Sequence, residues 1–195
     1  MSCDLTFGDF IELEEGEIKG RLALNFYSDV LNIDELWENS SLSANFLSTF
    51  WGNFFPKKDL KSGRTRKELQ EEIRYICGEL LGNAVKFSYE PDCMAEICLY
   101  LHEQELRFYV KNSVNPDNIQ ELQNLINKIL TEDTNELFLE QMEKNADSGD
   151  ESGVGLLTLI NDYGVTLAWK FHTNESGFHM VTTLARLPIT WDKNR

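Results

Sequence analysis

The segment from Glu79 to Ser88 places a carboxylate, a carboxamide and an ammonium group at helical spacing. Glu79, Asn83 and Lys86 are three or four residues apart, so on a helix they share one face. Such a trio is suited to binding phosphate together with a divalent cation. The spacing therefore predicts a phosphate-and-metal face, and the ordinary alternative is the solvated polar side of an amphipathic helix.

A second set of residues predicts the helix that must carry this face. Apolar side chains recur at the i, i+4, i+7 spacing of a one-sided amphipathic helix. The set comprises Ile73, Cys77, Leu80, Ala84 and Phe87. At about 100° per residue, the centres of the two stripes lie roughly a third of a turn apart. We therefore expect the apolar stripe to face the core while the polar stripe stays available for a ligand.

A glycine pair downstream supplies the other half of a phosphate site. Gly153 and Gly155 directly precede an apolar run, Leu156 to Ile160, which reads as a helix ending near Gly164. Glycine reaches positive φ and allows close backbone approach, so backbone N–H groups and a helix N-terminus can meet an anion there. A flexible loop capping a helix would have the same sequence, and the pair gains weight only beside the first motif.

Together the two motifs resemble those of the GHKL (histidine kinase-like) ATPase superfamily. Glu79 to Ser88 resembles its N-box, and Gly153 to Leu157 resembles its second glycine box. The likeness spans roughly Leu69 to Leu187. It implies a Bergerat-type ATP-binding fold, with ATP or ADP and Mg²⁺ as cofactors.

The resemblance also implies a role for each matching residue. Asn83 would ligate the Mg²⁺ that bridges the phosphates, and Glu79 would act as general base or orient the acceptor. Lys86 would approach phosphate, and the Gly153–Gly155 loop would form the hinge of the phosphate lid. The remaining nucleotide contacts implied by the family pattern are Leu156 after the glycines and a hydroxyl on the last strand. Alternation lets only one of Thr182 and Thr183 point inward, and Thr183 is the candidate.

One box departs from the family pattern. The first glycine box should follow the second strand of the central pair, where the chain reads Val110 to Pro116. Asn112 stands where the adenine-reading Asp is expected, and Val114 stands where the first Gly is expected. An Asn still accepts a hydrogen bond from an exocyclic amine, but without the charge that strengthens it. Two hypotheses follow: a kinase, or a pseudokinase that lost its adenine site and works by docking another protein.

The rest of the chain selects a branch of the family. All three histidines follow the N-box, which disfavours the phosphoacceptor His of sensor kinases, and 195 residues suffice for one domain with a modest extension. The chain looks most like the anti-sigma-factor serine kinases and their SiaB-type relatives. The resemblance implies a Mg-ATP-dependent serine/threonine kinase that phosphorylates or sequesters a small STAS-type regulatory partner.

Composition sets limits on compartment and partners. A net charge of -15 disfavours nucleic acid and anionic membranes as partners, and 42% hydrophobic residues are typical of a globular protein. The sequence contains no apolar run of membrane-spanning length and no signal-peptide pattern at its start, which predicts a cytoplasmic protein. Four cysteines without metal-site spacing are interpreted as buried or free reduced thiols.

The predicted fold is an α/β (α+β) two-layer sandwich with a mixed, mainly antiparallel sheet and helices on one face. Residues 1–66 form an N-terminal extension, packed on or continuous with the core, and residues 67–190 form the ATPase domain. Alternating apolar residues predict strands, and longer periods predict helices. The strands are expected at 19–27, 95–101, 106–110, 165–171 and 178–187, the helices at 34–55, 119–130 and 137–144, and a linker at 56–66. The resemblance to the GHKL family implies a mobile lid within the acidic segment 116–151.

The helix expected at 34–55 is unusually aromatic. Phe50, Trp51, Phe54 and Phe55 are spread over more than one helical face. They are either buried between the sheet and the extension or exposed as a patch for a homodimer mate or another partner.

Overall fold

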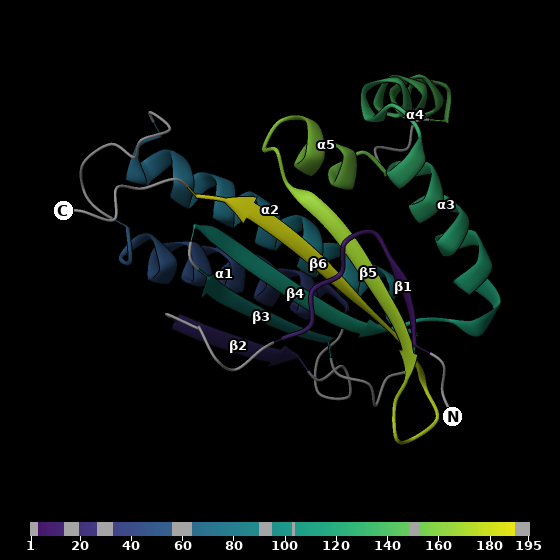
Figure 1. Cartoon of the computed structure of the whole chain (residues 1–195), viewed down its shortest axis with the longest axis horizontal. Coiled ribbons are helices and arrows are strands. Elements are labelled where there is room, and N and C mark those ends of the chain that lie inside the picture. The colour runs from purple at the N-terminus through teal and green to yellow at the C-terminus, as the bar shows by residue number, and fades with distance from the viewer. Residues whose placement is uncertain are drawn as a thin grey trace.

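The computed structural model describes residues 4–13, 20–26, 33–55, 64–89, 95–102, 104–148 and 153–189. The described chain forms a two-layer sandwich of one antiparallel sheet and a set of helices (Figure 1). The predicted linker at 56–66 lies largely outside these residues, as do Cys3 and Cys93.

Six strands build the sheet in the order β1-β5-β6-β4-β3-β2. Every pairing between them is antiparallel, so the prediction of a mixed sheet is wrong. The reason is the connectivity, since two hairpins, β3-β4 and β5-β6, meet through antiparallel β4 and β6. The strands are β1 Leu5–Phe7, β2 Gly20–Phe26, β3 Ala95–His102, β4 Glu105–Ser113, β5 Thr166–Thr173 and β6 His179–Pro188.

Helices α1 and α2 lie behind the sheet in Figure 1, and α3, α4 and α5 gather beyond β5 at the upper right. One core joins the two groups, because Ile126 of α3 and Leu159 of α5 are buried in the same cluster as the sheet and α2. The helices are α1 Ile33–Gly52, α2 Arg66–Phe87, α3 Ile119–Thr131, α4 Thr134–Ser148 and α5 Gly155–Asn161, with a 3₁₀ turn at Pro116–Asn118.

Helix α2 begins at a capping box. The Thr65 hydroxyl accepts from the Glu68 N–H at 3.2 Å, and the Thr65 N–H donates to the Glu68 carboxylate at 2.7 Å, which satisfies two N-terminal donors. The predicted apolar stripe is buried from Ile73 to Ala84. Phe87, expected in that stripe, is 57% exposed, so its placement in the core was wrong. It is the last residue of α2, and its ring instead lies 5.5 Å from the Lys86 ammonium.

The acidic segment before the glycine pair is mostly helical. The two predicted helices are confirmed as α3 and α4, and α4 extends to Ser148. The reciprocal bonds of Thr134 and Asn161, at 2.6 and 3.1 Å, tie the start of α4 to the end of α5.

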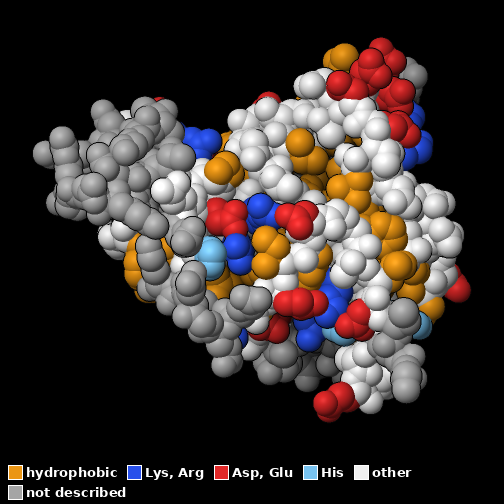
Figure 2. Space-filling model, viewed as in Figure 1, with side chains coloured by type: hydrophobic (Ala, Val, Ile, Leu, Met, Phe, Trp, Pro, Cys, Tyr) orange, Lys and Arg blue, Asp and Glu red, His pale blue; other side chains and the backbone are white. Residues whose placement is uncertain are grey.

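Residues 4–13 cross the opposite face of the sheet (Figure 1). This path was not predicted from the sequence. We call residues 4–13 the N-terminal strap. The Tyr109 hydroxyl donates to the Ile11 carbonyl at 2.9 Å, and Phe10 packs edge-to-face on the Tyr109 ring. Three strap carboxylates bind two cations of the sheet, with Asp4 and Glu12 on Lys170 and Asp9 on Arg186. Acidic and basic side chains alternate across this face in Figure 2.

The aromatic residues at the end of α1 and in the turn that follows it divide between the two alternatives. Trp51 and Phe55 are buried at 0% and 1% exposure, whereas Phe54 is 47% exposed. Phe50 is partly buried against the core. Neither alternative therefore holds for all four residues. Some pack against α2 and the core, and others face solvent.

Two further expectations concern thiols and membranes. Cys77 and Cys98 are free and buried, and burial raises the pKa of the Cys77 thiol. Within the described ranges, no helix combines the length and apolarity needed to span a bilayer.

Candidate functional site

The polar stripe of α2 is formed as the spacing predicts. Glu79 and Asn83 are half-buried, and Lys86, in the last turn, is exposed. The Asn83 carboxamide makes no hydrogen bond to any other described residue. A half-buried amide without a partner keeps one carbonyl oxygen and two N–H donors available for a ligand.

The carboxylate of Glu79 brings the two motifs together. It lies so close to Gly155 that a methyl group on that glycine would collide with it. Gly155 is the first residue of α5, so the carboxylate of one motif touches the backbone of the other. This contact explains why the position needs glycine: the requirement is close approach, not a positive φ.

Tyrosines surround this contact. Tyr75 lies one turn before Glu79 on α2, and its ring stacks on Tyr163 at 5.1 Å. Burial raises the pKa of the Glu79 carboxyl, and the neighbouring Tyr75 hydroxyl opposes that rise. Burial also raises the pKa of Tyr75, helped by the Glu79 charge and opposed by the Thr158 hydroxyl. The pKa of this carboxyl therefore lies closer to neutral pH than that of a solvated glutamate. A shift in this direction favours a general base.

The loop before α5 owes its shape to its first glycine. Gly153 has φ +89°, the left-handed region that favours glycine, and it lies beside the Gln141 side chain of α4. Leu156, predicted to contact nucleotide, is half-buried and packs against the main core. The two glycines therefore differ in their roles: Gly153 adopts a positive φ, and Gly155 allows α5 to approach Glu79 of α2 closely.

Asn112 and Thr183 occupy the helix-facing side of neighbouring strands. Val110 is opposite Thr183 and Asn112 is opposite Val181, so Thr183 and Asn112 share this side while Thr182 points to the other face. Asn112 is 5% exposed, and its Nδ2 donates to the Ser113 carbonyl at 2.8 Å. Its side-chain oxygen makes no hydrogen bond to any described residue.

Val114 fills the position of the missing glycine. It is 5% exposed, belongs to the main core, and its N–H donates to the His179 carbonyl at 2.9 Å. Nearby, the Tyr89 N–H donates to the Ser113 hydroxyl at 3.1 Å, which ties the chain just after α2 to the end of β4.

The structure thus unites some predicted residues and leaves others apart. Glu79 contacts Gly155, and Asn83 and Lys86 follow Glu79 along α2. None of the described hydrogen bonds joins Asn112 or Thr183 to these three. Sequence reasoning missed Tyr75, Thr158 and Tyr163. Only Tyr75 had a readable signal, since it stands four residues before Glu79 on the predicted helix.

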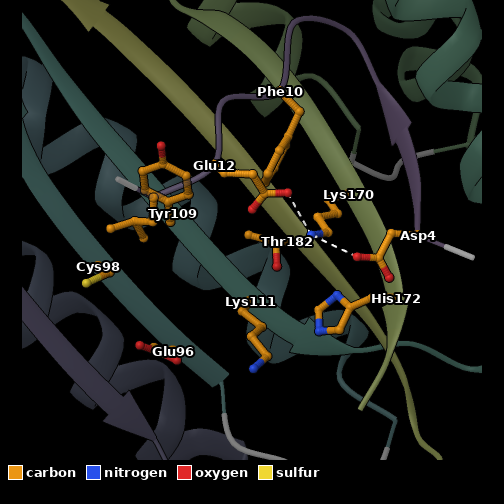
Figure 3. A pocket seen from close by; sticks show the side chains of 11 residues that line it. Asp4, Phe10, Glu12, Glu96, Cys98, Tyr109, Lys111, Lys170, His172 and Thr182 are labelled. Atoms are coloured by element: carbon orange, nitrogen blue, oxygen red, sulfur yellow. Dashed lines mark hydrogen bonds and ion pairs between the residues drawn. The ribbon is translucent and has the colours of Figure 1, made fainter. Parts of the chain in front are cut away.

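Metal ligands of the classical kind are scarce. Among the residues that the structure describes, no group of three or more His, Cys, Asp or Glu side chains could hold a metal ion. A cavity of about 250 Å³ lies on the other face of the sheet, beneath the N-terminal strap, and contains none of the predicted nucleotide residues (Figure 3).

Comparison of the sequence with protein-family models and with curated proteins gave no match in either case.

Proposed function

We propose that this protein is a Mg-ATP-dependent serine/threonine protein kinase of the GHKL superfamily, with a Bergerat-type fold, acting on a small STAS-type regulatory partner. The observation that carries the proposal is the contact between Glu79 and Gly155. Two segments far apart in sequence, each resembling a box of that superfamily, meet at the atoms to which the resemblance assigns chemistry.

Asn83 fits the role of metal ligand. Mg²⁺ is commonly held by one or two protein oxygens, with substrate phosphates and water completing six positions. The half-buried Asn83 oxygen, without a protein partner, suits such a site, and the exposed Lys86 ammonium suits a phosphate oxygen. When bound, the metal would neutralise charge on the phosphates.

Glu79 fits the role of general base. In the transfer, the acceptor Ser or Thr oxygen bonds to the γ-phosphorus, the bond to the β-phosphate oxygen breaks, and ADP leaves. Glu79 takes the hydroxyl proton, for which a raised pKa is favourable. Asn112 can accept a hydrogen bond from the adenine amine through its side-chain oxygen, since its Nδ2 is already used.

Calorimetry with Mg-ATP tests the proposal. The wild-type protein is expected to bind, and Asn83→Ala is expected to give no heat because the metal ligand is lost. Asn127→Ala removes a similar side chain from an exposed position of α3 and should bind like the wild type. A wild-type protein that gives no heat with Mg-ATP, at concentrations where it is folded, would refute the kinase.

One observation, at Asn112 and Val114 where the family pattern would contact adenine, favours a second function. Asn112 donates to its neighbour's carbonyl and Val114 is packed in the core, where the family pattern has an Asp and a Gly. These features support a non-catalytic pseudokinase that sequesters its partner. Transfer of labelled phosphate from ATP to a co-purifying protein would exclude it, and stable partner binding without any ATP binding would support it.

A further inference from the structure

A separate cavity lies between the N-terminal strap and the outer face of the sheet (Figure 3). Its volume is about 250 Å³. None of the residues assigned to the proposed kinase site lines this cavity, so the two sites are distinct, and its size suits a small metabolite.

One end of the cavity presents polar groups without partners. Lys111 and Thr182 are opposite each other on β4 and β6, and His172 lies on β5 beside them. None of the three side chains makes a hydrogen bond or ion pair to another described residue. The Nδ1 atom of His172 is buried without a partner, so Nε2 is the ring nitrogen that a ligand in the cavity can reach. An ammonium, a hydroxyl and an imidazole nitrogen left unpaired together match a carboxylate, which accepts several hydrogen bonds.

The protonation of His172 follows from its surroundings. Burial lowers the pKa of the imidazole, and the nearby charge of Lys111 lowers it further, while Asp4 opposes the change. The ring is neutral at neutral pH and can present one N–H and one lone pair.

The acidic side chains of the cavity differ in availability. Asp4 and Glu12 bind Lys170 at 2.9 and 2.7 Å, so these charges are largely satisfied. Glu96, opposite Lys111 on β3, forms no ion pair with any described cation and lines the same space. Because three carboxylates and two ammonium groups line the cavity, a dianion would be repelled, whereas a ligand carrying its own cation would not.

The other end of the cavity is apolar. Phe10 and Leu13 of the strap, with Cys98 and the ring of Tyr109, line it. Tyr109 keeps its hydroxyl bound to the Ile11 carbonyl, so the ring offers mainly apolar surface. An apolar group buried there gains about 25 cal/mol for each Å² removed from water.

We propose that this cavity binds a free α-amino acid with an apolar side chain. The carboxylate lies at Lys111, Thr182 and His172, the ammonium group faces Glu96, and the side chain occupies the space between Phe10, Leu13 and Tyr109. The three recognition points match the three parts of the ligand, and the zwitterion adds no net charge to an acidic cavity.

The test uses three probes of nearly the same shape on the full chain. L-Leucine carries both charged groups, 4-methylpentanoate lacks the ammonium group, and isopentylamine lacks the carboxylate. Titration is followed by the imidazole NMR signals, assigned with His172→Gln. Leucine is expected to shift the His172 signal with millimolar or tighter affinity, and each truncated probe to bind about tenfold more weakly or worse, the usual cost of losing a charged hydrogen-bond pair.

Variants locate the two charged contacts. Lys111→Met should weaken leucine about tenfold or more, and Thr182→Val should weaken it less. Glu96→Gln should weaken leucine but not 4-methylpentanoate. Lys128→Met, on the exposed side of α3, is the matched control and should bind leucine normally. Each variant is compared after its thermal unfolding is shown to match the wild type.

Two results would overturn the proposal. The first is no His172 shift in the wild type with leucine, valine or phenylalanine at millimolar concentration. The second is binding of 4-methylpentanoate as tight as that of leucine, which would make the site one for simple carboxylates. Neither result depends on ATP, so failure here is distinct from failure of the kinase.

Discussion

At the scale of single residues, Glu79 of α2 contacts the first residue of α5. Its carboxylate lies against Gly155, with Tyr75 beside it, in a half-buried position. The two neighbours act on different properties: the glycine leaves the space that the carboxylate occupies, and the tyrosine limits the rise in its pKa.

The contact predicts opposite effects for two glycine substitutions. Gly155→Ala forces Glu79 or α5 to move and should lower the free energy of unfolding by about 1–3 kcal/mol, with loss of any Mg-ATP binding. Gly78→Ala, next to Glu79 on α2, meets no atom within 4 Å and should raise stability by about 0.5–1 kcal/mol, since alanine favours the helix. Urea denaturation measures both. Equal effects would show that the Glu79 contact is not tight.

The pKa of Glu79 predicts a pH-dependent effect of Glu79→Gln. Because the folded-state pKa lies above the ordinary 4.5, the folded protein binds this proton more tightly than the unfolded chain. The contribution to stability is therefore largest at low pH and falls as pH rises from the ordinary pKa through the raised one. Glutamine does not titrate, so stability of the variant relative to wild type should increase across that window. A difference that stays constant from acid to neutral pH would contradict the raised pKa.

Spacing alone placed Glu79, Asn83 and Lys86 on one face of α2, because side chains three or four apart on a helix are neighbours whatever the tertiary structure. It could not identify the partners of Glu79 on α5. Those depend on how two helices cross, which no local pattern contains.

At the scale of elements, α1 and the turn that follows it carry both buried and exposed aromatic residues. Phe55 is 1% exposed, whereas Phe46 is 52% exposed and lies near Phe50 with ring centroids 6.1 Å apart. Phe46 lies in α1 and Phe55 lies three residues after its end. The two phenylalanines therefore form a matched pair that differs in burial.

Alanine substitution of this pair should separate core from surface. Phe55→Ala should cost about 3–5 kcal/mol, the range for truncating a buried phenylalanine, and Phe46→Ala should stay within about 0.5 kcal/mol. Equilibrium unfolding by urea gives both values. A cost for Phe46→Ala that grows with protein concentration would instead reveal an interface between copies of the chain.

Element positions followed from local periodicity more closely than did their pairing. Strands β2 to β6 and helices α1 to α4 appear within a few residues of the predicted spans. Strand β1 has three residues, too few for a periodic signal, and was missed. The sheet was wrongly expected to be mixed because strand direction depends on connections, which periodicity does not describe.

At the scale of the molecule, charge is distributed unevenly. The chain has 33 acidic and 18 basic residues, yet the outer face of the sheet gathers Lys111, Lys170, Arg107 and Arg186. The acidic N-terminal strap lies over this face and pairs with two of these cations. The ion pairs between the strap and the sheet are therefore attractive. Elsewhere the excess acidic side chains repel one another.

Net repulsion predicts that salt stabilises the fold. Raising NaCl from about 0.1 M to about 1 M shortens the Debye length from about 10 Å to about 3 Å. Because the net charge is -15, we expect lost repulsion to exceed lost ion-pair attraction, with Tm rising by roughly 2–4 °C per kcal/mol gained. Calorimetric melting at both concentrations measures it, with KCl as the control for specific ion effects. A lower Tm at high salt would mean that the ion pairs of the strap dominate.

The sequence by itself determined the helices and most strands, and it determined that Glu79, Asn83 and Lys86 share one helix face, because both depend on spacing of a few residues. Only the tertiary structure decided that Glu79 meets Gly155, that Thr183 rather than Thr182 shares a face with Asn112, and that residues 4–13 roof a cavity on the far side. Each of these depends on contacts between segments distant in the chain. These contacts are stabilised by burial and by charge pairing, so they form only when the helices, the sheet and the strap have packed together.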